Sequence, residues 1–333
     1  MMSKKAFEMQ FNWIFVLVAG AAILLFFTAV VVKQKSVSET STKATVLKSI
    51  EAIITGSSVS TDTTNIIDIP NSNIEVGCGR VSVGAVSKQF QSLILYAPGL
   101  IKGDKIITQT LAFNAPYRAT NLLFITSPQL RYIIIGNSNL AKEINKSLPS
   151  ELKKEFYMAK PEVKNSNNYK VRFVLFDDMI DFPKELAKMP DSDVTAVKVS
   201  GDIEKGAIEF YQKESNSWLF KGRSSYLGKS SLIGAVYSDA LDTYGCNMQN
   251  AFYRLGIVTK IYFERAKKLM QAGLSRREVE CSQFYSNALA QLSKIYSSSA
   301  DFNEENVDAI ADASKSLANE NKNAQLYSCA LIY

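Results

Sequence analysis

The hydrophobic pattern of the chain is dominated by one long apolar run near its beginning. Trp13 to Val32 contains no charged side chain and a single hydroxyl, that of Thr28. A helix of this length covers about 30 Å, the thickness of the hydrocarbon core of a bilayer, and it pairs its own backbone groups, as lipid requires. The pattern therefore predicts a transmembrane helix over 13–32 that partners the lipid bilayer, preceded by a short N-terminal tail over 1–12.

This apolar run is longer than the core of a secretory signal peptide, which is about 7–15 residues long and is followed by a cleavage site with small residues. Here the run ends in Val32-Lys33-Gln34-Lys35, which offers no such site. We therefore expect an uncleaved, single-pass anchor. Lysines flank both of its sides, so the positive-inside rule does not fix its orientation.

A second hydrophobic pattern, with the period of an amphipathic helix, follows the anchor. Lys48 and Glu51 lie on the side opposite to the apolar positions. The apolar side chains recur at three- and four-residue spacing, at Val46, Leu47, Ile50, Ile53 and Ile54. The segment 33–56 is thus predicted to be an amphipathic stalk that can continue the anchor helix.

The segment 57–243 is predicted to be an α/β domain. Its first half contains short apolar strands, among them 66–69 and 74–78, separated by Gly, Pro and Asn residues. In its second half, continuous apolar strands alternate with helical stretches, which is typical of a parallel sheet covered by helices. The strands are expected at 131–135, 169–176 and 194–199, the helices at 138–156, around Leu186 and at 231–241, and an edge hairpin at 207–212 and 217–221.

The last part of the chain, 244–333, is predicted to be a helical subdomain packed on the α/β domain. Three apolar stripes at helical spacing indicate three helices. Gly273 is expected to end the first of them, and Asp301 is expected to cap the third.

Cysteine and histidine usage bears on the compartment. The four cysteines, Cys78, Cys246, Cys281 and Cys329, all follow the anchor, none belongs to a C-x-x-C pair, and the chain has no histidine. This pattern favours two disulfides and an oxidising, extracytoplasmic compartment over a zinc site. Four buried free thiols in a cytosolic domain are the alternative. Packing of the last helices would bring Cys329 to Cys281 and leave Cys78 for Cys246, which is one of three possible pairings.

The N-terminal region resembles type IV pilin-like proteins, in which a spanning helix runs into an amphipathic stalk and then into β structure. Lys4-Lys5-Ala6 followed by Phe7 looks like the site cut by archaeal prepilin peptidases. The match departs from the usual pattern in having Ala6 in place of Gly before the cut and Phe11 where pilins carry Glu. The resemblance implies cleavage ahead of the apolar segment, which would leave the helix on the protein.

The stretches 11–17, 33–36 and 66–70 also resemble uncharacterised single-pass membrane proteins of small-celled archaea. They cover the anchor, its flank and the Ile-Ile-Asp-Ile-Pro segment. This resemblance implies an archaeal envelope protein, and it transfers neither an activity nor functional residues.

Three carboxylates, Asp177, Asp178 and Asp181, follow the second of the predicted parallel strands, at the edge where sheets of this class bind ligands. Such a group could hold Ca²⁺ or Mg²⁺ and would then serve a membrane-tethered hydrolase. Asp is also common in solvated loops. The interpretation we prefer is a loop in which Asp181 caps a short helix over 183–189.

Other motifs do not amount to a catalytic site. The glycines in Gly222 to Ser230 have the wrong spacing for a phosphate-binding loop, and helix capping explains Ser150 near Lys153 and the run at 136–138. The absence of histidine excludes Ser-His and Cys-His mechanisms. The net charge of +6 is not gathered into a basic face, so we expect no nucleic-acid partner, and we expect no cofactor.

The sequence as a whole favours a single-pass cell-envelope protein with a disulfide-braced extracytoplasmic head that binds or assembles with envelope partners and has no catalytic activity. The retained anchor, the placement of the cysteines and the lack of a catalytic set support this interpretation. A pilin-like filament subunit is the first alternative, and a membrane-tethered, metal-dependent hydrolase is the second.

Overall fold

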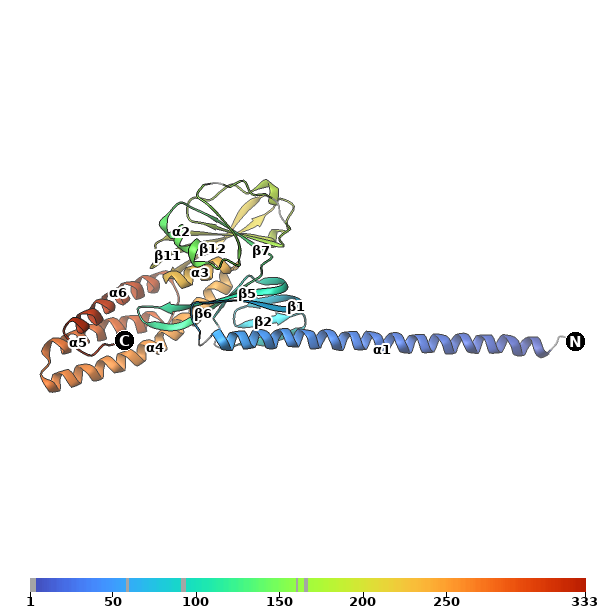
Figure 1. The fold of residues 1–333 in the computed structure, drawn as a ribbon, viewed down its shortest axis with the longest axis horizontal. Coiled ribbons are helices and arrows are strands. Elements are labelled where there is room, and N and C mark those ends of the chain that lie inside the picture. Colours follow the sequence, from blue (N-terminus) through green and yellow to red (C-terminus); the bar gives the residue numbers. More distant parts are fainter. Residues whose placement is uncertain (1–3, 58–59, 91–93, 160, 165–166) are drawn as a thin grey trace.

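A long helix, α1, projects from a folded head, and the last helices extend from the other side of the head (Figure 1). The computed structural model describes all residues except 1–3, 58–59, 91–93, 160 and 165–166, and it describes their side chains except those of 4–15 and 36–40 in α1. Its mixed α/β content, with two six-stranded sheets and C-terminal helices, confirms the fold class expected from the sequence.

The expected anchor and stalk form one continuous helix, α1 (Lys4–Ser57). Within it, Val16–Lys35 is long and apolar enough to cross a membrane, and none of this window is buried against the rest of the protein. The side chain of Trp13, where the span was predicted to begin, lies outside the described residues.

The first sheet is mainly antiparallel, in the order β3-β2-β1-β5-β6-β4, with only β4 pairing in parallel, to β6. The two strands expected at 66–69 and 74–78 are one bent strand, β1. Pro70 cannot donate to the ladder, and the pairing of β1 with β5 shifts between Asp68 and Ser72. The strands are β1 (Thr63–Gly77), β2 (Arg80–Val83), β3 (Val86–Gln89), β4 (Leu95–Tyr96), β5 (Leu100–Asn114) and β6 (Arg118–Thr126).

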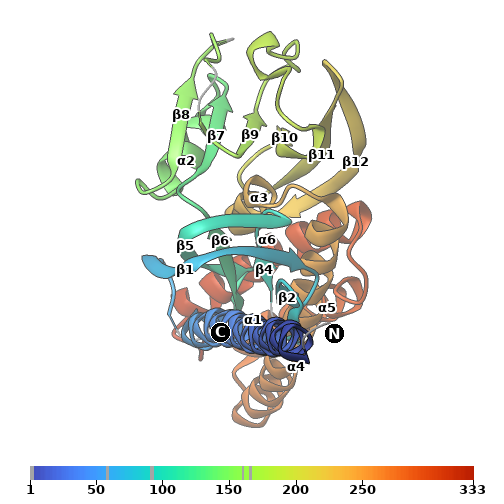
Figure 2. The same cartoon turned by 90° about the vertical axis from the view of Figure 1, so that its right-hand side faces the viewer.

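The end of α1 packs on this sheet. Val46, Leu47 and Ile50 are at most 5% exposed, and they share an apolar cluster with Ile74 of β1 and Ile106 of β5. Figure 2 looks along α1 and shows the helix lying against β1 and β2. Because each fully buried side chain of this size contributes about 1.5–3 kcal/mol, the head holds the stalk firmly in place.

The second sheet combines parallel strands with an edge hairpin, as the sequence predicted. Its order is β12-β11-β10-β9-β7-β8, in which β10, β9, β7 and β8 run parallel and β11 and β12 are antiparallel. Its strands are β7 (Leu130–Ile135), β8 (Lys153–Tyr157), β9 (Lys170–Leu175), β10 (Val194–Gly201), β11 (Lys205–Glu214) and β12 (Ser217–Leu227).

The helix expected over 138–156 is much shorter than predicted. α2 (Asn139–Ser147) begins at its Ser138 cap and ends before Pro149. A proline pushes the residue before it out of the helical region, so the helix cannot continue there. The chain then forms β8 as a fourth parallel strand at the sheet edge. The prediction was wrong because a partly exposed edge strand has no continuous apolar run.

α3 (Gly228–Tyr237) lies between the two sheets (Figure 2). All of its residues from Ser230 onward are buried, and its apolar side chains belong to the cluster formed by both sheets. Gly234 allows close contact with the ring of Tyr96, since a Cβ there would come within 2.8 Å of that ring. α3 therefore joins the two sheets into one core.

Three long helices complete the head: α4 (Leu241–Arg276), α5 (Val279–Ser298) and α6 (Glu304–Leu326). α4 continues past Gly273, because the left-handed turn that ends it lies at Arg277, with φ 61°. α6 is capped by Asn303, whose side chain accepts a hydrogen bond from the backbone N–H of Asn306, and not by Asp301.

Two disulfides connect these parts. Cys78, in the turn between β1 and β2, bonds to Cys246 in α4. Cys281 in α5 bonds to Cys329, which follows α6. These are the two pairs that we expected from the sequence, and among the described residues no cysteine is free.

Candidate functional site

The three aspartates considered for a metal lie on the surface of the head. Asp177, Asp178 and Asp181 are all exposed, and Asp177 Oδ2 accepts a hydrogen bond of 3.3 Å from the backbone N–H of Asn137. In the part of the chain that the structure describes, no group of three or more His, Cys, Asp or Glu side chains is placed to hold a metal ion. The metal site at these aspartates, on which the hydrolase hypothesis depends, stays a prediction.

The short helix expected after these aspartates is also different. It is a single 3-10 turn, η1 (Lys184–Leu186), whose N-cap position is Pro183 and carries no capping hydrogen bond from a side chain. A second such turn, η2 (Asp191–Asp193), precedes β10.

The remaining motifs have structural roles. Ser138 caps α2 by accepting a hydrogen bond from Ala141 N. Ser150 lies beyond the end of that helix, so it is not a cap, and its hydroxyl donates to Glu151. Gly222 lies inside β12 and Gly228 begins α3, so the glycines do not form a loop around a phosphate.

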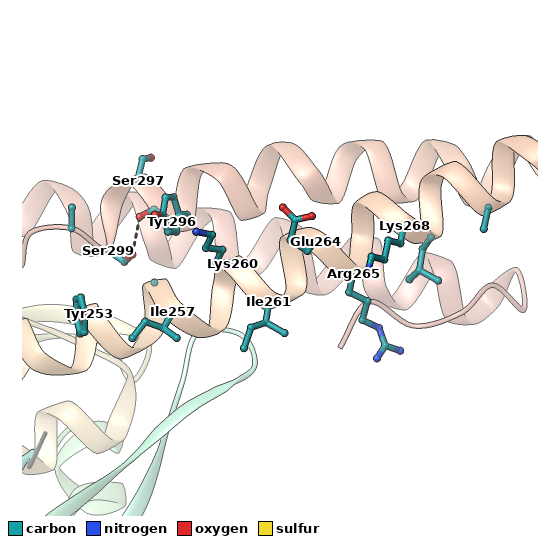
Figure 3. Close-up of a pocket in the computed structure, with 14 residues that line it drawn as sticks. Tyr253, Ile257, Lys260, Ile261, Glu264, Arg265, Lys268, Tyr296, Ser297 and Ser299 are labelled. Carbon is teal, nitrogen blue, oxygen red and sulfur yellow. Dashed lines mark hydrogen bonds between the residues drawn. The ribbon is translucent and has the colours of Figure 1, made fainter.

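A concave surface with a volume of about 1390 Å³ runs along α4 as a groove, shown in Figure 3. One wall is the outer face of α4. The other wall comes from the end of α5, where Tyr296, Ser297, Ser299 and Ala300 lie. We call this feature the α4 groove.

Large apolar side chains on α4 are exposed in this groove. Tyr253, Ile257 and Ile261 follow one another at four-residue spacing and are 65%, 42% and 63% exposed. The neighbouring face of α4, with Phe252 and Leu255, is completely buried in the core. A surface helix usually presents polar residues on the side away from its core, so α4 has an additional apolar stripe that the described residues leave largely exposed.

The groove depends on a close approach between α4 and the end of α5. Gly256 lies against Ser299, whose Oγ would come within 2.5 Å of a Cβ at this position. The Ser299 hydroxyl in turn donates to the carbonyl oxygen of Tyr296 at 2.7 Å, the dashed line in Figure 3. This contact fixes the last turn of α5, and the ring of Tyr296 remains 50% exposed at the wall of the groove.

The charged residues of the groove are mainly cationic. Lys260, Arg265 and Lys268 line it together with a single carboxylate, that of Glu264. Arg265 is partly held in position, because its Nη2 donates to the carbonyl oxygen of Leu331 at 3.0 Å. Neither lysine forms an ion pair among the described residues, so the positive charge of the groove is available to a ligand.

The sequence analysis missed this groove, although a signal was present. Tyr253, Ile257 and Ile261 form a second stripe in the segment that forms α4. The stripe that predicted the helix faces the core, and it consists of Met248, Phe252, Leu255, Val258, Tyr262 and Leu269. The segment contains more apolar residues than the core-facing side of one helix uses. This excess could have indicated a binding surface.

Comparisons with known proteins provide no functional assignment, so the proposal below is argued from the structure. No protein-family model, no curated protein and no solved structure matches this chain.

Proposed function

We propose that the chain is a single-pass membrane protein of the cell envelope whose extracytoplasmic head binds a partner at the α4 groove, without catalysis. The main observation behind the proposal is that one segment of α1 is exposed and another is buried in the head. Its window Val16–Lys35 is 0% buried, whereas Val46 and Ile50 in the same helix are 0% and 2% exposed. One helix thus offers one segment to lipid and another to the core of the head.

The physical argument is the cost of exposing apolar surface. Leu24, Leu25 and Phe26 are 69%, 72% and 66% exposed, and in water each would forfeit about 1.5–3 kcal/mol relative to an apolar environment. A bilayer removes this cost without any contact to the head. From Lys35 to Val46 the helix rises only about 16 Å, so the base of the head would lie close to the lipid headgroups.

The two disulfides support an extracytoplasmic head, because such bonds persist in oxidising compartments. The α4 groove supports a binding role, since large apolar patches on a protein surface typically mark interaction sites.

Membrane fractionation combined with thiol labelling tests the proposal. The full-length chain is expressed, and its cysteines are alkylated after denaturation, with or without prior reduction. We expect the chain in the membrane fraction and its thiols reactive only after reduction. A soluble chain, or thiols that all react without reduction, contradicts the proposal.

A pilin-like filament subunit is the second candidate, and one observation favours it. The apolar segment and the stalk are a single helix that is followed by β structure, and this order of elements is the one on which the resemblance is based. The side chains of the Lys4-Lys5-Ala6 leader lie outside the described residues. Mass spectrometry of the native N-terminus separates the two candidates: Phe7 as first residue supports a processed pilin-like subunit, whereas Met1 or Met2 speaks against it.

A further inference from the structure

We infer that the α4 groove binds an acidic amphipathic helix of a partner protein. The inference rests on the proposed function, because it specifies the chemistry of the partner that the extracytoplasmic head binds. It is carried by the spacing of the apolar side chains, the shape of the groove and the sign of its charge.

The apolar side chains have the spacing of a helix-binding surface. Tyr253, Ile257 and Ile261 recur every four residues and extend over about 12 Å along α4. An amphipathic helix that binds a groove presents its own anchors at positions i, i+3 or i+4, and i+7, which cover a similar length. Two helices packed along each other would therefore bring the two rows of anchors into contact.

The shape of the site also favours a rod-shaped partner, such as a helix, over a partner with a flat surface. The outer face of α4 and the end of α5 form two walls, and Tyr296 stands on the second of them (Figure 3). A helix with its side chains is about 10 Å wide, and a groove of about 1390 Å³ accommodates several turns of it.

The charge of the groove selects the partner. Lys260, Arg265 and Lys268 outnumber the one carboxylate of Glu264. Asp or Glu side chains beside the apolar anchors of the bound helix would complement this charge. A second copy of the same α4 face would bring the same excess of cations, so self-association at the groove is electrostatically unfavourable.

The acidic helix of the chain itself is already engaged elsewhere. In α6, Asp308 pairs with Lys205 at 2.9 Å, and Glu304 pairs with Arg223 at 3.2 Å, so this acidic side faces the second sheet. The membrane that holds α1 is also out of reach. The bundle of α4, α5 and α6 extends from the head in the direction opposite to the N-terminus of α1 (Figure 1).

Site-specific photocrosslinking in cells tests the inference with the full-length, membrane-anchored chain. A photoreactive amino acid replaces Ile257 in the groove, and in a matched control it replaces Phe220, an exposed side chain in β12 that is 52% accessible. The crosslinked peptides are then sequenced by mass spectrometry. We expect the Ile257 probe, and not the Phe220 probe, to crosslink to a segment of another protein with apolar residues at helical spacing and adjacent Asp or Glu.

Charge reversal gives the second readout. Lys260→Glu combined with Lys268→Glu is expected to lower the yield of this crosslink by about tenfold or more, because like charges would then face each other. Changing the acidic residues of the crosslinked segment to Lys is expected to restore it. Both lysines are exposed, so an unchanged thermal unfolding curve shows that the variant is folded.

Other outcomes overturn the inference: crosslinks only to a second copy of the chain, only to lipid, or only to a segment without acidic residues, or no crosslink at Ile257. Charge reversal without effect also overturns it. A crosslink of the Ile257 probe to a protein segment without acidic residues overturns the inference alone, whereas no crosslink at Ile257 also contradicts partner binding at the groove. Fractionation and thiol labelling report the membrane anchor and the compartment independently of both.

Discussion

Replacing Asp239 with Asn is expected to destabilise the head strongly, since this carboxylate faces buried cations between the two sheets. Asp239 Oδ2 pairs with Lys170 Nζ, and the two side chains are 11% and 7% exposed. Asp239 Oδ1 accepts a hydrogen bond of 2.8 Å from the backbone N–H of Gly99, which leads into β5. The carboxylate thus connects the end of α3 to strands of both sheets.

Arg172 adds a second cation to this region. Its side chain is 2% exposed, and its Nη2 donates to the carbonyl oxygen of Ala235 at 2.9 Å, in the last turn of α3. Burial lowers the pKa of Arg172 to about 10, and the charge of Asp239 acts in the opposite direction. The Nη1 atom is buried without a hydrogen-bond partner among the described residues, so Arg172 depends on nearby negative charge.

The expected magnitude follows from this burial. Removing one partner of a buried ion pair typically costs about 3–5 kcal/mol, because the remaining charge is left uncompensated. Asn retains an oxygen for the backbone N–H of Gly99, so Asp239→Asn removes the charge and keeps this hydrogen bond. For a head of this size, such a loss corresponds to a fall in Tm of about 6–20 °C. The combined change Lys170→Met with Asp239→Asn is expected to recover part of it.

Thermal unfolding of the purified chain in detergent micelles, followed by far-ultraviolet circular dichroism, measures this effect. Asp68→Asn is the control, because Asp68 pairs with Lys105 at 3.4 Å on the surface, where the two side chains are 83% and 52% exposed. An exposed pair contributes at most about 1 kcal/mol. If Asp239→Asn lowers Tm no more than this control does, the buried charge is not compensated by Asp239 and the reasoning is refuted.

Three further predictions concern other parts of the molecule. Ile50→Ala is expected to cost about 2–5 kcal/mol in urea unfolding, because Ile50 is 2% exposed between α1 and the first sheet; an unchanged midpoint would show that the stalk does not pack there. Hydrogen bonds from Arg131 lower the pKa of Glu155 below its ordinary 4.5, so this group contributes stability above that pH and loses the contribution as the pH falls through its folded value. Unfolding at several pH values should therefore show the stability gap between wild type and Glu155→Gln closing in acid, and a constant gap would contradict the assignment. Replacing Cys78 and Cys246 by Ser opens a loop with a sequence separation of 168, for which chain entropy gives a loss of about 5 kcal/mol; equal stability of the variant and the oxidised protein in urea would contradict this.

Several elements could be predicted from the sequence because their signals are local. The apolar run that gives the candidate span, the stripe of the stalk and the continuous apolar strands β7, β9 and β10 each depend on the spacing of residues close together in the chain. In such a segment, the order of apolar and polar residues alone shows the period of a helix or the continuous apolar run of a buried strand.

Element boundaries and one edge strand were less predictable from local patterns. Gly273 was expected to end α4, yet the helix continues to Arg276 and ends in a left-handed turn at Arg277. The segment that forms β8 was read as helix, although its neighbour β7 offers an edge with which it pairs in register from Arg131–Lys153 to Ile135–Tyr157. Such pairing depends on a partner distant in sequence, which a local pattern does not reveal.

The sequence by itself determined that this chain has a membrane-spanning candidate, an amphipathic continuation and cysteines suited to two disulfides, since composition and periodicity carry these properties. Only the tertiary structure decided that α3 joins two sheets into one core and that Asp177, Asp178 and Asp181 are exposed. It also decided that the outer stripe of α4 remains uncovered next to the end of α5. The physical reason is that an apolar side chain becomes core or binding surface according to what packs against it, and residues far apart in the chain supply that contact.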